Sequence, residues 1–170
     1  NNQVARHLQI HDFATLLIDL LTEKEAANRD NIFDIGLLAE RFLGVTRWIL
    51  EQPDLQSLPI GYFGASTGAA AALVAAANAP ETVTAVVARG GRVDLAGQYL
   101  EKVKAPTLFL VGEKDDLVLQ LNKQSMESLT CKKDLEIIPG ATHLFEERGA
   151  LELVSQKATN WFTTHLVKRD

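Results

Sequence analysis

The sequence predicts an α/β fold, a doubly wound, mostly parallel β-sheet with helices on both faces. Short apolar runs alternate with longer amphipathic runs along the chain, as in successive βαβ units. The uninterrupted apolar run at residues 106–112 is typical of the centre of a parallel sheet. No repeat, low-complexity linker or Pro/Ser-rich boundary divides the 170 residues, so we expect a single domain over residues 1–170.

Five short segments, most of them apolar, have the length of strands, and the segments between and after them have the length and spacing of helices. The predicted strands cover residues 13–20, 58–64, 83–88, 106–112 and 134–140. The predicted helices cover residues 32–51, 67–79, 94–103, 118–129 and 145–166, and the opening residues also read as a helix. In such sheets a functional site lies beyond the carboxyl ends of the strands.

Local signals support these helix boundaries. Asp30 or Asn31 is available to cap the helix at 32–51, after a polar loop at residues 22–31. Alanine and glycine residues let the helix at 67–79 lie close to the sheet, and Pro80 ends it. One side of the last helix is formed by Leu151, Val154, Ala158, Phe162 and His165.

Composition and charge argue against several classes of partner. The net charge is −5 and no block of Lys and Arg stands out, which argues against nucleic acid or an anionic membrane surface. The longest apolar run, around residues 68–77, is too short to span a bilayer. Cys131 is the only cysteine, so we expect no internal disulfide, a reducing cytoplasmic compartment and no catalytic role for this thiol.

The stretch GYFGASTGAA, at residues 61–70, places Ser66 where a strand gives way to a helix. A serine on such a tight turn needs small neighbours, which Gly64 and Gly68 supply, and the turn exposes its hydroxyl. The backbone N–H of Thr67, at the helix start, can point toward a developing oxyanion. The alternative is that Ser66 only caps the helix.

A serine nucleophile needs a base and a carboxylate that orients the base. Asp115 comes just after the strand at 106–112, and His143 comes just after the strand at 134–140. The order Ser66, Asp115, His143 predicts a catalytic triad. Asp115 could instead be a turn residue or helix cap, and His143 a surface loop residue. Asp116 is interpreted as the helix-capping neighbour of the catalytic acid.

Arg89 lies at the end of the strand at 83–88, near the expected site. It could clamp a substrate carboxylate. Alternatively, Arg89 or Arg92 pairs with Asp94 or another acid to fix the loop, which is the interpretation we favour. Only a few residues precede the next helix, so no sizeable lid is expected and small soluble substrates are favoured.

No other pattern predicts a site. The glycine-rich stretch lacks the lysine of a P-loop and the spacing of a dinucleotide-binding turn. No cluster has metal-ligand spacing, so we expect no metal and no cofactor. Histidines without a partner pattern are interpreted as structural or exposed, and these are His7, His11 and His165.

Several segments together resemble the dienelactone-hydrolase-like branch of the α/β-hydrolase superfamily. The resemblance rests on residues 13–20 and on GYFGASTGAAAAL, VVARGGRVDLAG, PTLFLVGEKDDLVLQLN and IPGATHLFEERGAL. It is strongest to the hydrolase domain that some bacteria fuse to a phosphoribosyltransferase. It implies Ser66 as nucleophile, His143 as base and Asp115 as acid. Dienelactone hydrolase has cysteine at the nucleophile position, so Ser66 places dienelactone as substrate in doubt.

The resemblance also implies an N-terminally incomplete fold. The family fold begins with about three more strands, and the loop after the third carries the second oxyanion donor. We therefore expect an upstream segment of the same protein, before residue 1, to pack on the sheet edge beside residues 13–20.

Two functions follow from these patterns. The first is a serine hydrolase for small soluble esters, lactones or thioesters, acting through an acyl-enzyme. The alternative is a non-catalytic module of the same fold that regulates or scaffolds a fused or partner enzyme, such as a phosphoribosyltransferase.

Overall fold

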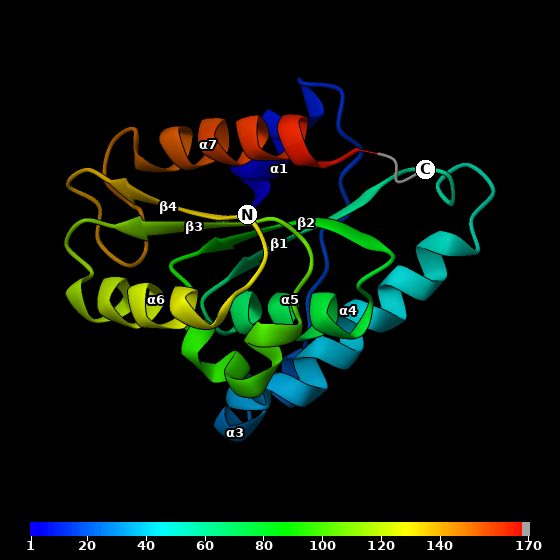
Figure 1. The fold of residues 1–170 in the computed structure, drawn as a ribbon, viewed down its shortest axis with the longest axis horizontal. Coiled ribbons are helices and arrows are strands. Elements are labelled where there is room, and N and C mark those ends of the chain that lie inside the picture. The colour runs from blue at the N-terminus through cyan, green and yellow to red at the C-terminus, as the bar shows by residue number, and fades with distance from the viewer. Residues whose placement is uncertain (168–170) are drawn as a thin grey trace.

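A four-stranded parallel sheet forms the centre of the molecule (Figure 1). The computed structural model describes residues 1–167. The strands are β1 (Ile60–Ala65), β2 (Val83–Arg89), β3 (Thr107–Gly112) and β4 (Lys133–Ile138). They lie in the order β1-β2-β3-β4, and every neighbouring pair is parallel. All four carboxyl ends therefore meet at one edge of the sheet.

Helices cover both faces of this sheet, as Figure 1 shows. One face carries α1 (Asn2–Gln9) and α7 (Ala150–His165). The other face carries α4 (Ile35–Leu50), α5 (Thr67–Asn78), the 3₁₀ segment η1 (Val93–Lys102) and α6 (Asp116–Ser128). The connections from β1 through to β4 all run over this second face, as right-handed crossovers in one direction require. The predicted doubly wound α/β sheet is confirmed.

Residues 13–20, predicted as a strand, form no strand in the structure. The other four predicted strands are confirmed as β1 to β4. A strand is made by hydrogen bonds to a neighbouring strand, and no backbone hydrogen bond joins residues 13–20 to β1 in the described part of the chain. The segment is apolar enough for a strand but has no partner there.

Several helix boundaries differ from the prediction. The region 22–33 contains α2 (Glu23–Ala26) and α3 (Arg29–Phe33), and Asp34 rather than Asp30 or Asn31 caps α4, because its carboxylate accepts from Leu37 N–H. The η1 segment is kinked at Gly97, which has a φ of 52°.

The last helix begins at Ala150 instead of residue 145. Phe145 and Gly149 both have positive φ, at 57° and 82°, and such backbone cannot continue a right-handed helix.

The core consists of two apolar layers, one on each face of the sheet. On the α4 side, the Tyr62 hydroxyl lies 2.6 Å from Thr46 Oγ1, which donates to the Phe42 carbonyl. Burial raises the pKa of Tyr62, so this phenol stays neutral. On the opposite side, Phe63 packs with the α1 and α7 layer. Alternate residues of β1 thus anchor helices on opposite faces.

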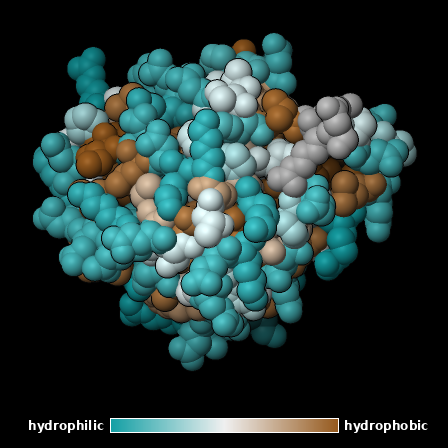
Figure 2. Space-filling model, viewed as in Figure 1, coloured by the Kyte–Doolittle hydropathy of each residue, from teal (hydrophilic) through white to brown (hydrophobic). Residues whose placement is uncertain are grey.

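The face of the molecule shown in Figure 2 is mostly hydrophilic, with separate hydrophobic patches. Among residues 1–167, no helix combines the length and the apolar character needed to cross a membrane.

Gly64 lets α5 begin directly against β1. A Cβ at this position would lie 2.4 Å from Gly68 O and 2.6 Å from Ala69 Cα, both backbone atoms that cannot rotate away. The start of α5 therefore has its place only because residue 64 has no side chain. Gly44, inside α4, has no such constraint, since its added Cβ would meet only the Arg47 guanidinium at 3.9 Å.

We predict that Gly64→Ala lowers the free energy of unfolding by about 2 kcal/mol or more, because the methyl group displaces the start of α5. Gly44→Ala, the control, should be neutral or raise it by roughly 0.5–1 kcal/mol through helix propensity. Urea unfolding of both variants measures the difference. Equal stabilities would contradict the close approach.

Candidate active site

Ser66 stands between β1 and α5 in a strained backbone conformation. Its φ of 53° and ψ of −124° lie outside the regions that L-residues normally occupy. Two backbone hydrogen bonds hold it there. Ser66 N–H donates to Arg89 O at 3.2 Å, and Ser66 O accepts from Arg92 N–H at 3.1 Å. The loop after β2 thus fixes the turn after β1.

The Ser66 side chain does not cap α5, although Ser66 occupies the N-cap position. Ser66 is a half-buried residue, and its hydroxyl is not used in a bond to the helix start. Thr67 is the first residue of α5, and its N–H has no acceptor within the helix. Gly68 differs from the expectation of a tight turn, because an added Cβ would meet only Leu20 Cδ1 at 3.7 Å. Gly64, not Gly68, supplies the essential room.

Asp115 and His143 are brought together by the ends of β3 and β4. His143 Nδ1 lies 2.6 Å from Asp115 Oδ2. The Asp115 side chain is largely buried and does not cap α6, even though Asp115 occupies the N-cap position. Asp116 is the first residue of α6 and not its cap, contrary to the sequence prediction. With Nδ1 donating to Asp115, the other ring nitrogen of His143 is left as a proton acceptor.

The loop that carries His143 crosses the ends of the neighbouring strands at two glycines. A Cβ on Gly112, at the end of β3, would lie 2.5 Å from Ala141 O and 2.7 Å from Thr142 O. A Cβ on Gly90, after β2, would lie 3.4 Å from His143 O and 3.7 Å from His143 Cε1. The loop after β4 therefore folds back over β3 and β2 toward the β1 side of the sheet.

Two carboxylates fasten this loop. Glu147 Oε1 accepts from Thr142 N–H at 3.0 Å and from Thr142 Oγ1 at 2.6 Å. Glu113 Oε2 accepts from Gly140 N–H at 2.7 Å. The Thr142 hydroxyl bond lowers the pKa of Glu147 most, so Glu147 stays ionised to lower pH than usual. Sequence reasoning missed both residues, because contacts five and 27 residues apart leave no periodic signal.

No hydrogen bond joins Ser66 to His143 in the described structure. They are linked through the loop after β2, since the Arg89 carbonyl accepts from Ser66 N–H and the next residue, Gly90, lies next to His143. The predicted nucleophile, base and acid thus lie at one edge of the sheet, and only the Asp115–His143 pair is bonded. Catalytic hydrogen bonds are often long before substrate binds.

The two arginines of the β2 loop have different surroundings. Arg92 Nε and Nη2 both donate to the Asp94 carboxylate, at 3.0 and 2.8 Å. Arg89 has no ion pair among residues 1–167, and its guanidinium lies 5.6 Å from the centre of the Phe145 ring. Burial lowers the pKa of Arg89. The loop-fixing pair therefore uses Arg92, and Arg89 retains its donors.

The remaining candidates lie apart from this edge. His7 and His11 pack against each other with tilted rings, and so do His165 and Trp161. Burial raises the pKa of the Cys131 thiol, which disfavours the thiolate that a reactive cysteine needs. Within residues 1–167, no group of three or more His, Cys, Asp and Glu side chains could hold a metal ion.

Comparison with known proteins finds relatives that carry two different names. Over 166 residues the chain is 57% identical to proteins of two Mycobacterium tuberculosis strains that are provisionally named phosphoribosyl transferases. That match covers 98% of this chain but only 38% of those relatives.

Solved structures with the same fold include a dienelactone hydrolase and an esterase domain. A dienelactone hydrolase from Anabaena variabilis is 54% identical, with a TM-score of 0.94 over 98% of this chain and 79% of its own. An esterase domain from Rhodothermus marinus shares the fold, with a TM-score of 0.76 and 18% identity over 98% of this chain and 80% of its own.

The neighbouring structures confirm the α/β-hydrolase fold expected from the sequence. A sequence model of the dienelactone hydrolase family matches residues 18–166, from the segment before α2 to the end of α7. The chain belongs to the dienelactone hydrolase family.

Proposed function

We propose that the chain is a cytoplasmic serine hydrolase for small soluble esters, lactones or thioesters, acting through an acyl-enzyme on Ser66. The observation that carries this proposal is the hydrogen bond between Asp115 and His143, at the sheet edge where the strained Ser66 turn stands. Membership of a hydrolase family supports the reaction class. The single cysteine supports a reducing compartment.

In the proposed reaction, Ser66 Oγ attacks the substrate carbonyl carbon and its proton passes to His143 Nε2. Asp115 accepts from Nδ1, which fixes the ring and stabilises the imidazolium. The Thr67 N–H donates to the oxyanion. His143 then protonates the leaving group, and a water molecule activated by His143 hydrolyses the acyl-enzyme. Each step uses only protein groups and water.

The expected substrates are small because the loop after β2 carries no lid. Residues 90–92 alone join β2 to η1, so no lid is inserted after β2. Arg89 pairs with Ala65 in the sheet, so it lies beside the Ser66 turn. Its guanidinium makes no ion pair among residues 1–167 and is therefore suited to bind a substrate carboxylate. The geometry thus favours Arg89 as clamp and Arg92 as the loop-fixing residue.

A non-catalytic module is the second candidate. It is favoured by the names of the Mycobacterium relatives and by the fact that this chain spans 38% of their length. In this case the domain would regulate or scaffold a fused enzyme, and Ser66 would carry no nucleophilic role.

Labelling by a fluorophosphonate distinguishes the two candidates. We predict stoichiometric modification of Ser66, complete loss of labelling in Ser66→Ala, and at least a roughly 1000-fold slower reaction in His143→Ala, because the hydroxyl then lacks its base. Mass spectrometry of the labelled peptide measures the site and the extent.

Two pairs of variants control this experiment. Ser128→Ala, at the end of α6, should label normally. Asp116→Asn should change the rate less than about twofold, whereas Asp115→Asn should lower it by several orders of magnitude because it stabilises the wrong imidazole tautomer. Absence of labelling in the folded, full-length protein would reject the enzyme and favour the module.

Glu147 is proposed as a positioning residue that acts through Thr142 and the His143 loop. We predict that Glu147→Ala lowers kcat about 10-fold with KM little changed, because loss of two hydrogen bonds loosens His143 without touching substrate. Glu147→Gln should restore most of the rate, because an amide oxygen still accepts both bonds. Equal losses in Ala and Gln variants would contradict this role.

Arg89 is tested by substrate charge. We predict that Arg89→Ala lowers kcat/KM for esters carrying a carboxylate by roughly 10- to 100-fold, the value of a charge-assisted hydrogen bond, and leaves neutral esters almost unchanged. Arg92→Ala, which breaks the Asp94 pair instead, should affect both classes equally. A panel of matched neutral and carboxylated esters provides the measurement, and equal losses in Arg89→Ala would remove the clamp.

A further inference from the structure

Asn122 is a fully buried polar residue of α6 that the candidate triad does not include. Its exposed fraction is 0%, and it lies on the face of α6 that also buries Val118 and Ser125. Its Nδ2 group donates to Val118 O and to Gly91 O, both at 2.8 Å. The first bond lies within the helix, whereas the second joins α6 to the loop after β2.

Stability alone does not account for an asparagine at this position. Within residues 1–167 the Oδ1 atom of Asn122 is buried and has no hydrogen-bond partner. A buried amide oxygen without a partner is unfavourable, and an apolar side chain of similar size would avoid that loss. The NH2 group has a specific use, because both of its partners are carbonyl oxygens, which need a donor. The bond to Gly91 O is therefore the contact that requires asparagine.

The peptide group between Gly91 and Arg92 connects Asn122 to the Ser66 turn. Its C=O accepts from Asn122 Nδ2, and its N–H donates to Ser66 O at 3.1 Å. The group is planar, and no cis peptide occurs in the described chain, so its C=O and N–H point in opposite directions. A bond that fixes the oxygen thus fixes the N–H as well, and hydrogen bonds in such a chain polarise one another. Asn122 therefore acts on Ser66 through a single peptide group.

Gly91 is enclosed by its neighbours. A Cβ at this position would lie 2.7 Å from Ala69 Cβ and 2.8 Å from Val93 Cγ1, so the loop lies directly against α5. In the described part of the chain the Gly91 carbonyl accepts no backbone hydrogen bond. A buried carbonyl needs a partner, and Asn122 provides it.

The helix that carries Asn122 also begins at the candidate catalytic acid. Asp115 occupies the N-cap position of α6, and Asp115 O accepts from Leu119 N–H at 2.9 Å. Asn122 follows about two helical turns later, so it lies on the same side of the helix as Asp115. The bond from Asn122 to Gly91 thus joins the element that holds Asp115 to the loop that holds Ser66.

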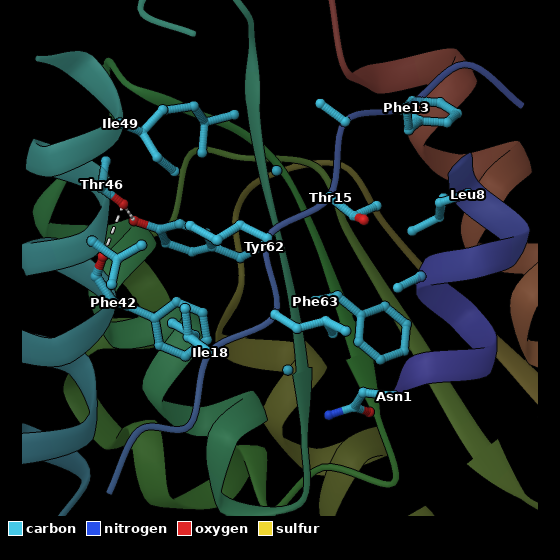
Figure 3. A pocket seen from close by; sticks show the side chains of 18 of the residues that line it. Asn1, Leu8, Phe13, Thr15, Ile18, Phe42, Thr46, Ile49, Tyr62 and Phe63 are labelled. Atoms are coloured by element: carbon cyan, nitrogen blue, oxygen red, sulfur yellow. Dashed lines mark hydrogen bonds between the residues drawn. The ribbon is translucent and has the colours of Figure 1, made fainter. Parts of the chain in front are cut away.

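We propose that Asn122 is a positioning residue for Ser66, which it holds through the peptide group of Gly91 and Arg92. This inference rests on the proposed nucleophilic role of Ser66. Strand β1 is anchored elsewhere, because Figure 3 shows Tyr62 pointing toward α4, where its hydroxyl meets Thr46 Oγ1, and Phe63 pointing toward α1. Loss of Asn122 should therefore loosen the turn after β1 and leave the strand in place.

Single-residue hydrogen exchange on the full-length protein tests the tether without reference to activity. In Asn122→Leu, the amides of Arg92 and Ser66 should exchange roughly 10-fold or more faster than in the unmodified protein. The Val86 amide, which donates to Pro106 O inside the sheet, is the internal control and should not change. Equal acceleration at all three amides would indicate general destabilisation and would overturn the proposal, as would unchanged exchange at Arg92 and Ser66.

Kinetics test the consequence for the reaction. We expect Asn122→Leu to lower kcat for a short neutral ester by roughly 10- to 100-fold with KM changed less than about twofold, because Ser66 is misplaced while no substrate contact is lost. Thr159→Val is the matched control, since Thr159 is also buried and donates only within α7, to Ser155 O. It should leave kcat and the Arg92 and Ser66 amides unchanged.

Asn122→Ser separates the two bonds of the amide. A serine hydroxyl can donate to the carbonyl four residues earlier, as Ser155 does to Leu151 O, but its shorter side chain gives up the bond to Gly91 O. We expect this variant to fold and to show the same losses as Asn122→Leu. Normal kcat and normal Arg92 exchange in Asn122→Ser, or failure of both variants to fold, would assign Asn122 to stability alone and reject the proposal.

The two proposals fail in different ways. Absence of fluorophosphonate labelling at Ser66 in the unmodified protein would reject the proposed hydrolase, whatever the exchange rates are. Faster exchange at Arg92 and Ser66 in both Asn122 variants would still support the tether in that case. Normal labelling of the unmodified protein together with unchanged exchange and kcat in the variants would reject the positioning role and leave the hydrolase intact.

Discussion

The close passage of the β4–α7 loop over the ends of β3 and β2 is the constraint on which the candidate site depends. His143 lies in the loop after β4, the strand farthest from β1 in the sheet, so it can approach Ser66 only if this loop folds back across two strand ends. That path passes within 2.5 Å of a Cβ position on Gly112, which only glycine can offer. Bonds from Glu147 and Glu113 then hold the loop in place.

Backbone hydrogen bonds from the end of β2 and the loop after it hold Ser66 in its strained conformation. Bonds to the backbone of Arg89 and Arg92 hold a φ of 53° that a serine would not otherwise adopt. Arg92 is in turn fixed by its two bonds to Asp94. The loop after β2 therefore has two roles, because it supports the Ser66 turn through backbone hydrogen bonds and contacts His143 at Gly90. A change in this loop would disturb both halves of the site at once.

The sequence predicts those features that depend on local pattern. Strands β1 to β3 are mostly apolar runs and β4 mixes charged with apolar residues, and Ser66, Asp115 and His143 follow three of these strands, so chain order alone places all three at one edge. Residues 13–20 are equally apolar, but strand formation depends on a partner that local pattern cannot supply. The break at Asp34, the kink at Gly97 and the clamp by Glu147 depend on side-chain bonds or positive φ at single positions, and these leave no periodic trace.

The packing of β1 ties the stability of the sheet to the candidate site. Tyr62 packs in the α4 layer and Phe63 in the α1 and α7 layer, so helices anchor both faces of β1. Ser66 follows β1 directly, and two backbone hydrogen bonds hold it against the loop after β2. A change that displaced β1 would therefore move Ser66 relative to the pair of Asp115 and His143, so the apolar packing of the sheet and the geometry of the site depend on each other.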